Sequence, residues 1–460
     1  MVRGKDLDVN NVLKYQNEQL RSIEFDASQL DGSIESSEEI LRSLGYSLDV
    51  DKAKSHAENS NAEWLPQREL VVPDWETLCK DANYNVDSPV QSVTELFTSE
   101  ELSENRMFIN KLNKDYNDIH KLDKVDIAIC AAAAIVSATV DILLVGIPGP
   151  TPDGVKAGPL SNYIRSYFEK KFPPEDMETL GSRSKYKTPY DAQDNRNTTE
   201  YVEGLSSYYH RMLSLGHDPL LGFLVGVLDI MNNSMTTIDK SGKIVSQVMG
   251  TYTGRSETSI FKAILRQLRH LKSDLTTSMG LPAPLMGLFN LFQFGKIGEE
   301  EQTIAEIVQG MYYDGYDFIQ FCSSSLPVML TETIVRIGWA MKRYREGRTI
   351  KECIPCSLNR ERNPKLATML FVAHSASTAI NAGKIAFTKN PMAINYPQWL
   401  AFAKYSFQQL KWNLYKKPEL RHRYVMDRID SERNDLLSEI DKDFEFYSSK
   451  VSVSEEVIVL

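Results

Sequence analysis

The sequence predicts an all-α protein, in which a polar helical N-terminal module precedes a bundle of apolar helices. Apolar runs of helical length recur along the chain, such as DIAICAAAAIVSATVDILLVG from Asp126 to Gly146. Gly/Pro corners separate these runs, and amphipathic pieces such as SSEEILRSLGYSL precede them. These observations divide the chain into a polar acidic module at 1–120, an apolar helical bundle at 121–416, and a charged C-terminal helix and tail at 417–460.

The composition limits the classes of function. The chain carries 52 Lys and Arg against 62 Asp and Glu, a formal net charge of −10, so the sequence gives no evidence for a nucleic-acid partner. Its five cysteines are few for 460 residues, and MVRGKDLDVNN has no features of a secretory signal. Both observations favour a reducing, cytoplasmic-side protein.

The run from Asp126 to Gly146 has the length of a membrane-spanning helix. At a rise of about 1.5 Å per residue it extends about 30 Å, which matches the hydrocarbon core of a bilayer. Its aliphatic residues favour insertion, whereas Asp141 near one end opposes it. Hydropathy therefore leaves a spanning helix and a buried core helix both open.

A corner between two predicted helices lies within YVEGLSSYYHRMLSLGHDPLLGFLVGVLDIMNN, residues 201–233. Gly216 is expected to end the first helix in a left-handed conformation, and Asp218 to cap the second. The second helix, 220–231, is apolar on every side except at Asp229, so we expect it to be buried in protein or lipid. The charged segment before this corner, KKFPPEDMETLGSRSKYKTPYDAQDN, is expected to lie at the surface.

Carboxylates and imidazoles gather on the apolar helices and their corners. Buried carboxylates are costly unless they are paired, protonated or bound to a metal. His270 and Asp274 are one helical turn apart and share a helix face. If such groups converge, an Asp/His site with an open position can hold a divalent metal and activate water for hydrolysis. The predicted catalytic residues are Asp141, His217, Asp218 and Asp229, and the predicted metal ligands are His210, His217, Asp218, His270 and Asp274.

Each of these groups also has a structural interpretation. Asp218 is placed to cap a helix, and the other carboxylates can bond to a neighbouring helix. His374, on the last apolar helix, is expected to be a hydrogen-bonded core residue. Glu332 and Arg336 are spaced i and i+4, which predicts an internal ion pair.

The order of several segments resembles a group of uncharacterised bacterial proteins carried on mobile genetic elements. These segments are VDILLVG, the GHDP corner with its following Asp, GLPxP with FQFG, LPVMLTETIVRIGWAMKR and KECIP. A much weaker likeness is to membrane-bound metal-dependent hydrolases, which have an early Asp in an apolar helix and an HR...THS element. Here Asp141, His210-Arg211 and His217 are similar, with a longer spacing between the histidines and Asp218 in place of the serine.

Two classes of function follow. The first is a membrane-associated, metal-dependent hydrolase, and the second is a non-enzymatic membrane or scaffold protein that acts as an effector of a mobile-element or antiviral defence system. We expect the cytoplasmic side of the bacterial inner membrane, because the basic loop after Met341 belongs there if helices span the bilayer. Membrane lipid and a second copy of the chain are the expected partners, and a soluble cytoplasmic protein is the alternative.

Overall fold

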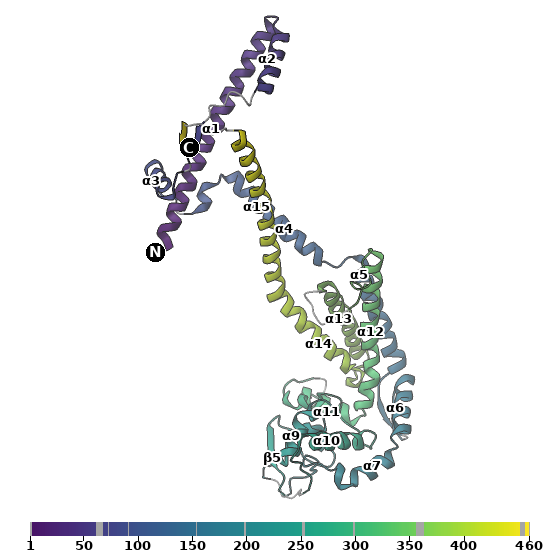
Figure 1. Cartoon of the computed structure of the whole chain (residues 1–460). Coiled ribbons are helices and arrows are strands. Elements are labelled where there is room, and N and C mark those ends of the chain that lie inside the picture. Colours follow the sequence, from purple (N-terminus) through teal and green to yellow (C-terminus); the bar gives the residue numbers. More distant parts are fainter. Residues whose placement is uncertain are drawn as a thin grey trace. The chain divides into compact units, whose positions relative to one another are not determined.

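The computed structural model describes residues 2–60, 68–71, 73–90, 92–152, 154–196, 199–250, 254–297, 300–355, 363–450 and 456–459. The described chain is mostly helical, which confirms the all-α prediction (Figure 1). It forms two compact units, one made of Met1–Ile119 with Lys416–Leu460 and the other of His120–Tyr415. The N-terminal module and the C-terminal helix therefore belong to one unit.

The first unit is polar and built from long helices. Its helices are α1 (Val2–Ser43), α2 (Ser47–Ser60), α3 (Trp75–Asn85), most of α4 (Ser99–His120) and α15 (Lys417–Lys450). Strand β1 (Arg68–Val71) pairs in parallel with β6 (Glu456–Val459), so segments near both ends of the chain meet in one small sheet. The side chain of Asn11 on α1 bonds to Asn83 on α3 at 2.9 Å and accepts from the Val90 amide at 3.0 Å.

One part of the second unit is a helical bundle, visible as packed helices in Figure 1. Its members are α5 (Lys124–Val140), α12 (Phe318–Arg345), α13 (Pro364–Thr388) and α14 (Tyr396–Lys411). Helix α5 begins at a capping box between Asp123 and Asp126 and continues into a π-helical turn, η2 (Asp141–Val145). Its buried face, which includes Cys130, packs against α12 and α13.

The polar groups inside the bundle have structural partners. Arg336 Nη2 lies 3.1 Å from Glu332 Oε2, which confirms the predicted ion pair, and the Tyr405 hydroxyl donates to the same carboxylate at 2.6 Å. His374 is fully buried, hydrogen-bonded to Gln398 and stacked on Tyr405. This confirms the prediction that His374 is a core residue.

Two helical stretches of the described chain are long and apolar enough to cross a membrane. They are Ser99–Val145 and Phe318–Arg345, whose most apolar 18-residue windows have mean hydropathies of 2.3 and 1.3. Only 28% and 39% of these windows is buried inside the protein. Length and composition alone are weak evidence for spanning, because core helices of soluble proteins share them.

The rest of the second unit carries shorter elements, and α9, α10 and α11 gather beyond one end of the bundle in Figure 1. Its helices are α6 (Pro159–Lys171), α7 (Pro174–Ser182), α8 (His210–Leu213), α9 (Val225–Asn232), α10 (Ile260–Asp274) and α11 (Ile304–Tyr313). Two antiparallel hairpins join them: β2 (Gly149–Thr151) with β3 (Gly154–Lys156), and β4 (Ser234–Ile238) with β5 (Ile244–Val248). The sequence segment of the second hairpin, NSMTTIDKSGKIVSQV, is polar enough to fit a turn region as well.

The corner at 201–233 departs from its prediction in two ways. Gly216 does not have a positive φ; a Cβ there would lie 2.6 Å from the Tyr190 ring, so close packing requires this glycine. The predicted helix at 220–231 is a 3-10 turn, η5 (Leu221–Phe223), followed by α9. It is not wholly buried, since Leu224 is 70% exposed and only one face packs inward.

Candidate metal centre

One face of α10 carries the framework of the site. Arg266, His270 and Asp274 are spaced by four residues and all are buried, which confirms that His270 and Asp274 share a face. Arg266 donates to the backbone carbonyls of Ser184 and Lys187 at 3.3 and 2.8 Å. These bonds hold the segment that leads to the site against α10.

In three buried histidines Nδ1 is engaged by a neighbouring group, and Nε2 is the ring nitrogen that remains available. His210 Nδ1 and His270 Nδ1 lie 2.8 Å from the carbonyl oxygens of Ser207 and Tyr186. A carbonyl can only accept, so both Nδ1 atoms carry the proton and both Nε2 atoms keep a lone pair. His217 Nδ1 lies 3.1 Å from the Asp274 carboxylate, which assigns the same tautomer.

The three Nε2 atoms are buried and have no hydrogen-bond partner among the described residues. Two of them face carboxylates: His210 Nε2 is 3.4 Å from Asp191 Oδ1, and His270 Nε2 is 3.4 Å from Asp274 Oδ2. Lone pairs that face one another repel unless a cation lies between them, and buried groups without partners call for such an explanation. The histidines therefore form a ready set of ligands for a positive ion.

Two overlapping groups can hold that ion. Asp191, His210 and His217 form one group, and His217, His270 and Asp274 form the other; in each, one ligand atom per residue lies within 4.8 Å of the others. His217 belongs to both. Imidazole with carboxylate is a ligand set typical of zinc, manganese or iron.

Asp274 orients the imidazoles and is itself held by Arg211. Arg211 Nη2 lies 3.1 Å from Asp274 Oδ1, while Oδ2 faces His217 and His270. Burial would raise the pKa of Asp274, but the charges of Arg211 and His270 and the hydrogen bond from His217 lower it well below its ordinary value. An ionised carboxylate behind a histidine is the usual way in which a metal-binding ring is aligned.

Burial keeps the central histidine neutral. The His217 side chain is fully buried, and this burial lowers its pKa to about 4 despite the hydrogen bond with Asp274. Burial also opposes ionisation of Asp191, yet the neighbouring side chains of His210, His270 and His217 lower its pKa. At neutral pH His217 is thus neutral, and Asp191 and Asp274 are ionised, which are the protonation states that a metal ion requires.

Tyr190 fixes the position of the central ring. Its ring lies edge-on to His217 and His270 at centroid distances of 5.2 and 5.3 Å. The Tyr190 hydroxyl donates to Gln267 Oε1, and Gln267 Nε2 donates to the carbonyl of Gly216 at 2.8 Å. This chain ties the segment before Asp191 to the corner that holds His217.

The cluster is reached through a pocket of about 510 Å³. Asp191, His270 and Asp274 line it, together with Arg211 and the C-terminal turn of α10. His210 and His217 are 4% and 0% exposed and lie behind these residues. A metal ion held here would have protein on one side and an open approach on the other.

Asp218, predicted as both catalytic and ligating, accepts three backbone hydrogen bonds. Its Oδ1 accepts the amides of Leu220 and Leu221, each at 2.8 Å, and its Oδ2 accepts the amide of Leu285. Asp218 is therefore a cap that joins two turns, as its structural interpretation proposes. It is not in either metal-binding group.

Asp229 is likewise occupied by local hydrogen bonds. Its carboxylate accepts from the hydroxyls of Ser234 and Thr236 at 2.8 Å and from the Thr236 amide at 2.9 Å. These bonds fasten the end of α9 to the start of β4. The structure does not bring Asp229 to the histidines.

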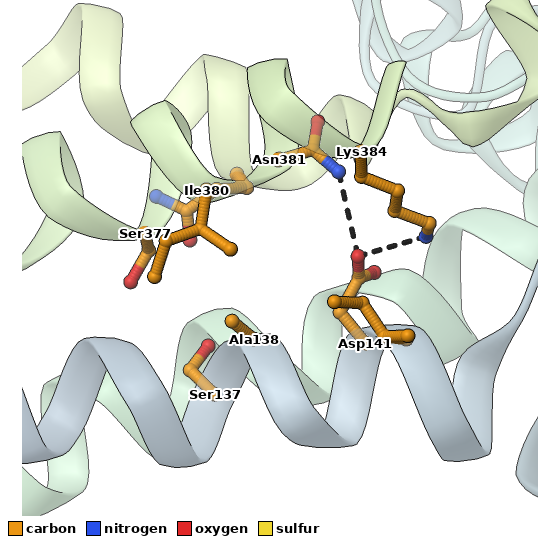
Figure 2. A pocket seen from close by; sticks show the side chains of 9 residues that line it. Ser137, Ala138, Asp141, Ser377, Ile380, Asn381 and Lys384 are labelled. Atoms are coloured by element: carbon orange, nitrogen blue, oxygen red, sulfur yellow. Dashed lines mark hydrogen bonds and ion pairs between the residues drawn. The ribbon is translucent and has the colours of Figure 1, made fainter. Parts of the chain in front are cut away.

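Asp141 lies in the bundle and pairs with α13, as Figure 2 shows. Lys384 Nζ is 2.9 Å from Asp141 Oδ2, and Asn395 Nδ2 donates to Oδ1 at 2.7 Å. The adjacent cavity has a volume of only about 10 Å³, which is room for about one water. The structure thus separates Asp141 from the metal-binding groups and gives it a structural partner.

Sequence reasoning missed Asp191 because it stands in a segment expected at the surface. That expectation is wrong for its last part: Thr188, Tyr190 and Ala192 are fully buried. The available signal was the proline, aromatic and alanine residues around a single Asp in TPYDA, which interrupt the charged pattern. Comparisons with protein-family models, curated proteins and solved structures found no match to this chain.

Proposed function

We propose that the protein is a metal-dependent hydrolase whose centre is formed by Asp191, His210, His217 and His270. The observation that carries this proposal is the set of three buried Nε2 atoms without partners, two of which face carboxylates at 3.4 Å. A structural ion would be enclosed by protein, whereas this cluster borders a pocket. An open position beside a metal is where water becomes acidic enough to attack a substrate.

The protein side chains have separable roles in this proposal. Asp191 and the histidines hold the metal, which would lower the pKa of a bound water and polarise the bond under attack. Asp274 aligns His217 through its Nδ1 at 3.1 Å and is neutralised by Arg211. The buried lining excludes competing solvent from the deep side of the cluster.

Metal analysis of the purified full chain tests the proposal. We expect about one zinc, manganese or iron per chain, retained through a desalting column. Asp191→Asn should bind that metal at least about tenfold more weakly, since it removes one charged ligand without changing side-chain size. His422→Gln, an exposed histidine on α15, is the matched control and should bind metal as the wild type does.

Turnover separates the two classes of function. Hydrolysis that is lost in Asp191→Asn and retained in His422→Gln would support the hydrolase. A folded wild-type chain that takes up none of these metals in competition with a weak chelator would refute the proposed centre. Stoichiometric metal with no turnover of ester, amide or phosphate-ester substrates would favour the non-enzymatic scaffold or defence effector.

We also propose that the bundle associates with a lipid bilayer. Exposed aliphatic side chains follow the outer face of α5 and of the turn η2 that continues it, including Ile127, Ile135 and Leu143 at 53%, 60% and 65% exposure. Lysines stand at both ends of this helix, where Lys342 pairs with Asp126 at 2.7 Å and Lys384 pairs with Asp141. An apolar band between two charged ends matches a membrane helix.

The side of the membrane and the oligomeric state stay predictions. The basic residues at the end of α12 favour the cytoplasmic side of the bacterial inner membrane. Homo-oligomer formation remains an expectation, and size-exclusion chromatography with light scattering in detergent would test it.

A further inference from the structure

A stripe of exposed apolar side chains runs along α1, the long N-terminal helix in Figure 1, to the first residue after it. Its members are Leu20, Ile23, Leu30, Ile34, Leu41 and Leu44. Their exposed fractions range from 44% at Leu41 to 65% at Leu44. None of the described chain therefore covers this stripe, although leucine and isoleucine are among the residue types most often buried in proteins.

The spacing of the stripe is that of a coiled coil. Counted from Leu20, its positions follow one another by three and four residues in alternation, and the small residues Ala27 and Ser37 fill the two remaining positions. This is the a and d pattern of a heptad repeat, which places all of these side chains along one face of the helix. We call this face the α1 seam. A seam of this kind is normally buried by a second helix that packs along it.

The exposed part of α1 gains little stability by itself. Gly32 lies in its middle, and nothing stands within 4 Å of the Cβ that a larger residue would add. The hydroxyls of Ser33 and Ser37 donate to carbonyls of the preceding turn at 2.9 and 2.8 Å. Glycine and serine favour the helix less than alanine does, and helices without tertiary packing are marginal in water. A second helix on the seam would supply that packing.

The charges beside the seam indicate which kind of helix fits it. In a coiled coil the e and g positions flank the seam and face the same positions of the other helix. With Leu20 at an a position, the charged residues at e and g are all acidic: Glu24, Asp26, Asp31 and Glu38. Glu38 pairs with Lys54 of α2 at 3.1 Å, whereas no described residue forms an ion pair with the other three. The seam is therefore flanked by negative charge.

A second copy of the chain does not match this charge pattern. In a parallel pair, Asp26 of one copy would face Asp31 of the other, because g positions meet the following e positions. In an antiparallel pair e positions meet e positions, which again places carboxylates opposite one another. Like charges opposite one another disfavour such a pair. An anionic bilayer is disfavoured for the same reason.

We propose that the α1 seam binds an amphipathic helix of another protein, with apolar residues at its a and d positions and lysine or arginine at its e and g positions. The basic residues of α1 nearest the seam do not oppose it, since Arg21 pairs with Glu101 at 3.8 Å and Arg42 with Asp51 at 2.6 Å. Burial of the stripe supplies affinity, and the opposite charges supply specificity. This inference is independent of the proposed metal centre.

Two synthetic peptides of about four heptads test the proposal on the full chain. Both carry leucine at a and d; one has lysine at e and g, and the other has glutamate. Fluorescence anisotropy of the labelled peptides measures binding. The lysine peptide should bind at least about tenfold more tightly than the glutamate peptide, and its affinity should fall as the salt concentration rises.

Charge reversal beside the seam should exchange this preference. Glu24→Lys combined with Asp31→Lys should weaken binding of the lysine peptide by about tenfold and strengthen binding of the glutamate peptide. Asp435→Lys combined with Glu439→Lys, at exposed residues of α15, is the matched control and should leave both affinities unchanged.

A substitution in the seam itself tests the apolar contact. Leu30 is 63% exposed, so Leu30→Asn should leave the fold intact and weaken binding of the lysine peptide by about tenfold. Equal affinity for the two peptides, or a Leu30→Asn protein that binds the lysine peptide as the wild type does, would overturn the proposal. Self-association or vesicle binding of the wild type that is lost in Leu30→Asn would also overturn it, because the seam would then belong to a second copy or to lipid.

Discussion

Asp274 contacts three side chains of the site, Arg211, His217 and His270. One carboxylate oxygen faces Arg211 at 3.1 Å, and the other faces His217 at 3.1 Å and His270 at 3.4 Å. The carboxylate therefore contributes both to the stability of the fold and to the alignment of the histidine rings. The two contributions can be separated, because the free energy of unfolding measures the first and metal affinity measures the second.

Asp274→Asn should change both the free energy of unfolding and the metal affinity. Arg211 would lose its counter-charge while it stays buried, which costs about 3 kcal/mol. The amide would no longer enforce the His217 tautomer, so zinc affinity should fall by about tenfold to a hundredfold. Denaturant unfolding and competition with a chromogenic chelator measure the two effects.

Asp317→Asn is the control for this variant. Asp317 forms a two-point pair with Arg165, at 2.9 and 2.8 Å, and lies outside both metal-binding groups. It should lose stability and keep the zinc affinity of the wild type. An Asp274→Asn protein with unchanged zinc affinity would show that Asp274 does not align the site.

All three histidines of the site are among the residues that the sequence predicts, whereas Asp191 is not. His270 stands on α10, whose helical periodicity can be read from the sequence, but His210 and His217 lie in a four-residue helix and a 3-10 turn. The role of a buried carboxylate depends on which side chains contact it in the folded chain. Asp141 meets Lys384 and Asp191 meets the histidines, and no local pattern distinguishes the two.

Among the structural elements, the corner at His217 depends on close packing against Tyr190. A Cβ on Gly216 would lie 2.6 Å from ring atoms of Tyr190, a buried side chain that cannot move freely. Gly216→Ala should therefore destabilise the fold by about 1–3 kcal/mol. Zinc affinity should fall as well, because Tyr190 adjoins Asp191, and thermal unfolding with and without zinc would show both effects.

Gly310→Ala is the matched control for that substitution. Gly310 lies inside α11, and nothing stands within 4 Å of the Cβ that alanine would add. Alanine is the better helix former, so this variant should be neutral or more stable by up to about 1 kcal/mol. If Gly216→Ala behaves like Gly310→Ala, contact with Tyr190 does not limit the corner.

The end of α5 is held to α13 by a buried ion pair. Lys384→Met would leave Asp141 buried without its cation, which should destabilise the bundle by about 3 kcal/mol. Zinc stoichiometry should not change, because Asp141 is not among the metal-binding residues. Lys389→Met, at an exposed lysine, serves as the control, and loss of zinc in Lys384→Met alone would restore a direct role for Asp141.

At the scale of the whole molecule, the helical class follows from the sequence and the partition into units does not. Apolar runs with helical periodicity are a local property, and they identify α5 and α12. The pairing of β1 with β6 joins residues separated by 388 positions, from Arg68 to Glu456. The hairpin β4–β5 was missed because its first strand, SMTTI, is rich in serine and threonine and also fits a loop.

Membrane association is the prediction that concerns the whole molecule. Ile135→Asp and Leu143→Asp, on the exposed face of α5 and η2, should remove the chain from carbonate-washed membranes, since each charge in lipid costs about 3 kcal/mol. In water the same exposed substitutions would change stability by only about 0.5 kcal/mol. Ile244→Asp, at an equally exposed residue on β5, controls for added charge. Wild-type protein found wholly in the soluble fraction would contradict the bilayer proposal and leave this apolar face to another protein surface.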